Sequence, residues 1–98
     1  MPTRTAVIAS SVGLHARPAG IFVGLAGEAV RAGVTVTIGR PGEDHVNAAS
    51  ILSVLSLGAR QGETVEVTAE GDNADDVLAR LVEELSTDRD ADPDAAAS

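Results

Sequence analysis

The sequence contains no cysteine, no tryptophan, no tyrosine and a single phenylalanine, Phe22. The absence of cysteine excludes disulfides and thiolate metal sites. Because aromatic side chains are almost absent, the core must be built from Val, Leu, Ile and Ala. A hydrophobic content of 44% over 98 residues still suffices for one folded domain with a modest core.

Lysine is also absent, so the seven positive charges are all arginines, against 15 Asp and Glu residues and a net charge of −8. Nucleic acids and anionic membranes bind clustered positive charge, so we expect neither as a partner. The chain shows no signal-peptide pattern and no apolar run near the roughly 20 residues that span a membrane. These features predict a soluble, cytoplasmic protein.

The most informative stretch is Gly13-Leu14-His15-Ala16-Arg17-Pro18-Ala19. Pro18 is typical of a first helical turn, which places His15 at or near the N-cap. Unpaired N–H groups and the helix dipole attract an anion at that end, and Arg17 adds a permanent cation. A lone histidine at a helix start is otherwise an ordinary polar residue. In this setting, an imidazole nitrogen could carry a phosphoryl group.

Periodicity predicts an α+β fold, a four-stranded antiparallel sheet covered on one face by three helices in the order βαββαβα. The strands are expected at 4–9, 34–38, 43–46 and 64–69. The helices are expected at 16–32, at 51–57 between a Ser50 cap and a Gly58 stop, and at 74–85 with Gly71-Asp72-Asn73 as its cap.

The apolar spacing also predicts which side chains are buried. We expect the inward residues to be Phe22, Leu25, Ala26, Ala29, Val30, Val34, Val36, Ile38, Val65, Val67, Ala69, Ala74, Val77, Leu78, Leu81 and Leu85, with Glu66 outward. The helix after Ser50 is too short to bury all of Ile51, Leu52, Val54, Leu55 and Leu57, so part of it should form an exposed docking patch. His45 is expected to be an exposed strand residue rather than a second catalytic histidine.

Three glycines, Gly20, Gly24 and Gly27, fall inside the first predicted helix. Each costs roughly 1 kcal/mol relative to alanine in an exposed helix interior. Two interpretations stay open: either tertiary packing tolerates the glycines, or they keep one helix face low so that a partner approaches closely.

The seven-residue motif resembles the active-site signature of the histidine-containing phosphocarrier protein (HPr) family of the bacterial sugar phosphotransferase system. The likeness extends over about residues 4–86 and includes Ser50-Ile51-Leu52-Ser53-Val54-Leu55-Ser56-Leu57-Gly58, similar to the family's regulatory-serine segment. It implies a covalent carrier without turnover of its own and without a cofactor or metal. His15 would accept phosphate on Nδ1 from enzyme I and donate it to IIA domains of sugar permeases.

The resemblance also assigns site residues. Ala16 and Arg17 would bind the phosphate, and Arg17 would steady its charge. Partners would dock on Gly20, Ile21, Gly24, Gly27, Ile51, Leu52 and Leu55. Ser50 aligns with a serine that a dedicated kinase phosphorylates in some members, but it is also an ordinary helix cap.

Two further expectations concern the chain as a whole. Residues 1–86 should form the phosphocarrier domain, as a monomer, and 87–98 a disordered acidic tail. The competing hypotheses are a regulatory module that uses phosphorylation only as a signal and, more weakly, a stand-alone enzyme.

Overall fold

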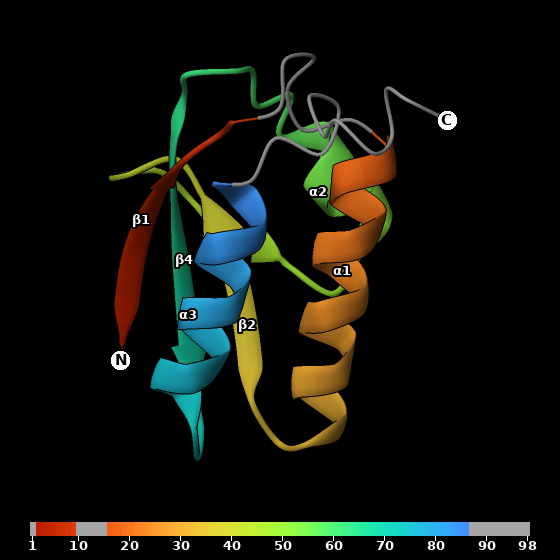
Figure 1. Cartoon of the computed structure of the whole chain (residues 1–98), viewed down its shortest axis with the longest axis vertical. Helices are drawn as coiled ribbons and strands as arrows, with labels where there is room; N and C mark the ends of the chain where they lie inside the picture. Colours follow the sequence, from red (N-terminus) through yellow and green to blue (C-terminus); the bar gives the residue numbers. More distant parts are fainter. Residues whose placement is uncertain (1, 10–15, 87–98) are drawn as a thin grey trace, which may run out of the picture.

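The four strands form one antiparallel sheet in the spatial order β1-β4-β2-β3. The computed structural model describes residues 2–9 and 16–86. Along the chain the elements are β1 (Thr3–Val7), α1 (Ala16–Arg31), β2 (Thr35–Gly39), β3 (Val46–Asn47), α2 (Ile51–Ser56), β4 (Thr64–Glu70) and α3 (Ala74–Leu85) (Figure 1). The predicted α+β class, element order and sheet are therefore confirmed.

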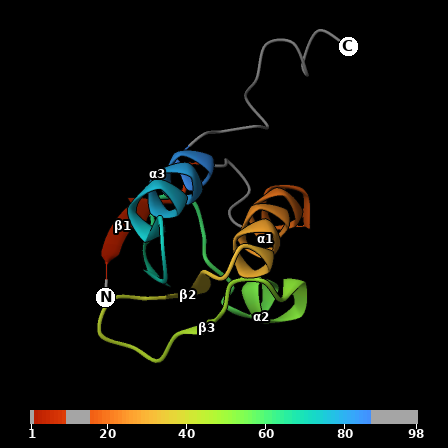
Figure 2. The same cartoon turned by 90° about the horizontal axis from the view of Figure 1, so that it is seen from below.

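Helices α1 and α3 lie side by side over one face of the sheet, whereas α2 packs against α1 and the short edge strand β3 (Figure 2). Within the described residues, no helix covers the opposite face. Thr5, Glu66 and Gly39 form a row across β1, β4 and β2 on that open face. The result is an open-faced sandwich that places α1 and α2 next to each other.

The core lies between the sheet and the two long helices, and its largest fully buried side chain is Phe22. The alternation read in the sequence is correct, because Val36, Ile38, Val65 and Val67 are all buried on the inner face. Leu78 and Leu81 of α3 pack into the same cluster. The sheet and both helices thus share one aliphatic core.

Val30 is the clearest error among the predicted core residues, since 47% of it is exposed. The buried stripe of α1 follows Ala19, Phe22, Ala26 and Ala29. Val30 is one residue beyond Ala29 and is therefore turned about 100° away from it around the helix axis. Leu25 and Val77, also predicted to be buried, are only partly so and pack at the margin of the core.

Strand β1 ends at Val7, two residues before the predicted end at residue 9. Ile8 and Ala9 lie beyond the paired part of the strand, but their N–H groups still donate to backbone carbonyls. The Ile8 N–H donates to Glu63 O at 2.9 Å, and the Ala9 N–H donates to Leu85 O at 3.1 Å. This stretch is therefore held by the turn before β4 and by the end of α3.

The two predicted helix caps have different outcomes. Ser50 is the N-cap of α2, and its hydroxyl oxygen accepts from the Ser53 N–H at 3.4 Å. Asn73 occupies the N-cap position of α3, but its side chain makes no capping hydrogen bond. Its backbone is left-handed, with φ 63°, whereas capping side chains normally extend from the β region. The predicted position of the cap is therefore correct, but Asn73 does not cap α3 through its side chain.

Candidate functional site

The candidate site begins where α1 begins, at Ala16. Pro18 is the third residue of the helix, in its first turn as predicted. The N–H groups of a first turn have no intrahelical acceptor and lie at the positive end of the helix dipole. His15 precedes Ala16 in the chain and, with residues 10–14, lies outside the described residues. Arg17 is the second residue of α1.

The predicted docking residues belong to two helices in contact, α1 and α2. On α1, Gly20 and Gly24 are exposed, while Ile21 and Gly27 are half-buried. A Cβ atom built on Gly20 or Gly24 would meet nothing within 4 Å. The surface beside the start of α1 therefore has open space over both glycines.

The predicted docking residues on α2, which are Ile51, Leu52 and Leu55, are apolar and partly exposed to solvent. Leu52 is 78% exposed and Ile51 38%, while Leu55 is half-buried and Val54 is fully buried. This confirms the expectation that so short a helix leaves apolar side chains outside. Ser50, the candidate regulatory residue, lies at the N-cap of this helix.

The turn from Arg60 to Glu63 borders the stretch that leads toward His15. The Gly62 N–H donates to Ile8 O at 2.9 Å, and Gln61 Nε2 donates to Ala9 O at 3.4 Å. The turn itself is closed by the Glu63 N–H, which donates to Arg60 O at 3.0 Å. Gly62 has φ +86°, a left-handed conformation that favours glycine in a tight turn.

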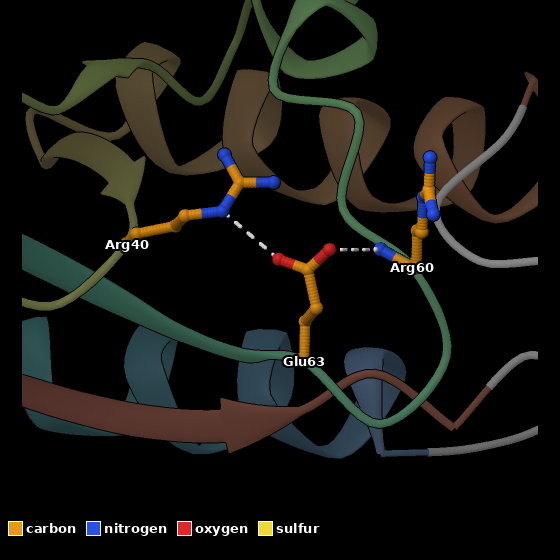
Figure 3. Close-up of polar contacts among 3 residues, drawn as sticks. All are labelled: Arg40, Arg60 and Glu63. Atoms are coloured by element: carbon orange, nitrogen blue, oxygen red, sulfur yellow. Dashed lines mark hydrogen bonds and ion pairs between the residues drawn. The ribbon is translucent and has the colours of Figure 1, made fainter.

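Three residues form a polar group that we call the Arg40–Glu63–Arg60 cluster (Figure 3). Arg40 Nε donates to Glu63 Oε2 at 2.9 Å, and the backbone N–H of Arg60 donates to Glu63 Oε1 at 3.1 Å. The hydrogen bond from Arg40, followed by that from Arg60, lowers the pKa of the Glu63 carboxyl group; the same bond raises the pKa of Arg40. No local pattern in the sequence predicts this cluster, because Arg40 and Glu63 are 23 residues apart in two unrelated turns.

His45 lies on the open face of the sheet, just before β3 rather than within a strand. Its Nε2 lies 3.1 Å from Glu66 Oε1, and its Nδ1 lies 3.4 Å from Thr37 Oγ1. The prediction of an exposed strand residue is wrong, since only 18% of the side chain is exposed. The cause is Gly39, over which the imidazole folds.

Among residues 2–9 and 16–86, no three His, Asp or Glu side chains gather closely enough to hold a metal ion. In the same part of the chain, no helix has the length and apolarity needed to cross a membrane.

An open-faced α+β sandwich whose first helix begins at the alanine of a His-Ala-Arg-Pro sequence is typical of a small phosphocarrier protein. The family model described as the PTS HPr component phosphorylation site matches residues 2–87. The chain belongs to the HPr family, the phosphocarrier proteins of the phosphotransferase system.

Curated relatives and solved structures agree with this assignment. The chain is 43% identical over 81 residues to phosphocarrier protein HPr of Streptomyces coelicolor, covering 83% of this chain and 84% of that one. It is 40% identical over 83 residues to HPr of Pseudomonas aeruginosa, covering 85% and 89%. The crystal structure of HPr from Thermoanaerobacter tengcongensis superposes with a TM-score of 0.75 at 35% identity, covering 87% and 91%.

Proposed function

We propose that His15 accepts a phosphoryl group from phosphorylated enzyme I and passes it to IIA domains of sugar permeases. One observation carries this proposal: α1 begins at Ala16, so the helix start follows His15 directly in a chain of the HPr family. A dianion on that histidine would be close to unpaired N–H groups and to the positive end of the helix dipole.

In the accepting step, Nδ1 of His15 attacks phosphorus while the bond between phosphorus and the donor breaks, and the bonding electron pair returns to the donor. The donating step is the same exchange with an IIA nucleophile. The N–H groups of Ala16 and Arg17 and the Arg17 guanidinium would stabilise the phosphoryl oxygens. Because the helix terminus still contributes, Arg17→Ala should slow the transfer without preventing it.

Partners would dock on the adjoining surfaces of α1 and α2. Support comes from the open space over Gly20 and Gly24 and from the exposure of Ile51 and Leu52. An exposed apolar group on a small protein favours contact with another protein. Ile21, Gly27 and Leu55 would complete the set that we call the docking face.

Ser50 would be a second, regulatory phosphorylation site if the cell contains a matching kinase. A phosphate there would stand at the N-cap of α2, where negative charge is favoured, and on the border of the docking face. It would displace the hydrogen bond to the Ser53 N–H. Mass analysis of protein isolated from the host, before and after phosphatase treatment, would detect it.

We propose further that the protein acts as a monomer in the cytoplasm, with residues 1–86 as the phosphocarrier domain and 87–98 as an acidic tail, and that it needs no cofactor. It would be a carrier rather than an enzyme, since the phosphoryl group enters and leaves through partner proteins.

A relay assay tests the whole proposal. Phosphoenolpyruvate labelled in its phosphoryl group, enzyme I, this protein and a purified IIA domain are combined, and label on the IIA domain is followed with time. Label should reach the IIA domain only when this protein is present, and His15→Ala should abolish the transfer. Label that stops on this protein would instead support the regulatory module.

A further inference from the structure

The docking face carries no charged side chain among its seven residues. Hydrophobic contact alone gives little orientation or steering to a protein of net charge −8. Arg60 lies four residues beyond the end of α2 and is exposed. It is therefore the charge nearest in the chain to the α2 half of the docking face.

Within residues 2–9 and 16–86, the Arg60 guanidinium forms no ion pair, and the one polar contact of Arg60 to a side chain is made by its backbone N–H. In Figure 3 its side chain leaves the turn in a different direction from the Glu63 carboxyl group, which contacts Arg40 and the Arg60 backbone. The guanidinium is thus not hydrogen-bonded to Glu63, and it belongs to the turn that follows α2.

The Glu63 carboxylate is not available to the Arg60 guanidinium, because both of its oxygens already accept hydrogen bonds. One carboxylate oxygen accepts from Arg40 and the other from the Arg60 backbone. The acid nearest in sequence therefore pairs with a distant arginine. Without Arg40, Oε2 would be open to the Arg60 guanidinium, which would then be neutralised.

The backbone that carries Arg60 is also fixed on several sides. Reciprocal hydrogen bonds link Arg60 and Glu63, from the Glu63 N–H to Arg60 O and from the Arg60 N–H to Glu63 Oε1. Gly62 is tied to Ile8, and Ala59, which precedes Arg60, is buried. A guanidinium on a fixed backbone loses less conformational entropy when it binds.

We propose that Arg60 is a specificity-determining residue that pairs with a carboxylate on the partner protein, and that Glu63 and Arg40 are positioning residues that present it. The proposal rests on the proposed function. A planar guanidinium with several fixed donors matches a carboxylate in bidentate geometry. A charge at the rim of an interface acts mainly on the rate of association and its salt dependence.

The test is the steady-state rate at which phosphorylated enzyme I transfers its phosphoryl group to wild-type protein and to variants, with this protein as the varied substrate. Arg60→Ala should raise KM about three- to tenfold with kcat unchanged, and it should flatten the dependence of kcat/KM on salt. Arg60→Lys should restore part of the loss. The matched control is Arg80→Ala, which removes an exposed arginine from α3, and it should leave KM unchanged.

The positioning residues are tested by non-additivity. Glu63→Ala and Arg40→Ala should each raise KM in the wild-type background and have no further effect in the Arg60→Ala background, because both act through Arg60. A purely structural role would raise KM equally in both backgrounds and would overturn the positioning claim.

The outcomes separate the two proposals. If wild-type protein accepts no phosphoryl group, the proposed function fails. If wild-type protein is phosphorylated normally and Arg60→Ala has wild-type KM and salt dependence, only the role of Arg60 fails. A fall in kcat at unchanged KM would place Arg60 at the transferred phosphoryl group and would likewise overturn its pairing with a partner carboxylate.

Discussion

The imidazole of His45 folds directly over Gly39, so that a Cβ atom on Gly39 would stand 2.5 Å from His45 Cδ2 and 2.9 Å from the Asp44 carbonyl oxygen. Gly39 therefore permits the loop before β3 to fold against β2. The same contact brings His45 to Glu66, on the neighbouring strand β4.

Gly39→Ala should destabilise the fold by about 1–3 kcal/mol, because the loop must move away from the sheet. Urea unfolding measures this loss. In a His45→Ala background, the loss of stability caused by Gly39→Ala should be smaller but not zero, because the new methyl group would still clash with the Asp44 carbonyl oxygen. Wild-type stability in the Gly39→Ala variant would show that the contact is not formed.

Gly24→Ala should have the opposite effect on stability. The new methyl group meets no atom within 4 Å, and alanine in place of glycine stabilises a helix interior by about 0.5–1 kcal/mol. The same methyl group should hinder a close partner, so KM for phosphoryl transfer should rise several-fold. A more stable protein with an unchanged KM would show that the glycine is merely tolerated.

Substitutions of Leu52 and Val54, two residues of the short helix α2, should distinguish an effect on partner docking from an effect on folding. Leu52→Ala should change stability by less than about 0.5 kcal/mol while lowering kcat/KM, because Leu52 is 78% exposed. Val54→Ala should cost on the order of 2 kcal/mol, because Val54 is fully buried. Equal stability losses in the two variants would contradict the assigned burial.

The Arg40–Glu63–Arg60 cluster predicts a pH dependence of stability. The hydrogen bond from Arg40, and then that from the Arg60 N–H, lowers the pKa of Glu63 in the folded protein. Glu63 therefore adds stability above its unfolded pKa, and this addition is lost as the pH falls through the lowered folded value.

Glu63→Gln should accordingly be less stable than wild type at about pH 7, and the difference should shrink at about pH 3. Thermal unfolding at the two pH values measures the difference. Glu70→Gln, at an exposed position on β4, serves as the control. A difference that stays constant with pH would contradict the role of the Glu63 charge.

The two long helices and the strands β2 and β4 could be predicted from sequence because their apolar residues repeat with the period of each element. In β2 and β4, every second residue is apolar and lies on the buried inner face of the sheet, as seen for Val36 and Ile38 and for Val65 and Val67. The start of α1 was likewise predictable from contiguous residues, since Pro18 lies in the first helical turn, whereas the role of His15 stays a prediction.

Long-range polar contacts could not be predicted in this way. The pairs Arg40–Glu63 and His45–Glu66 join turns and strands about 20 residues apart, and such pairs leave no periodic signal in the sequence. The prediction for Val30 was wrong for a related reason: the apolar residues of α1 extend around more of the helix than the core covers, and Val30 is turned about 100° away from the buried Ala29. These features depend on tertiary packing, which local patterns do not contain.

The central claim is that the histidine before α1 carries the phosphoryl group. The most direct measurement is the intact mass of the protein after incubation with enzyme I and phosphoenolpyruvate, followed by brief treatment with acid or base. We predict one added phosphoryl group that acid removes and base leaves in place, and no adduct on His15→Ala. A folded wild-type protein that gains no mass from an active donor, or whose adduct survives acid, would contradict the account.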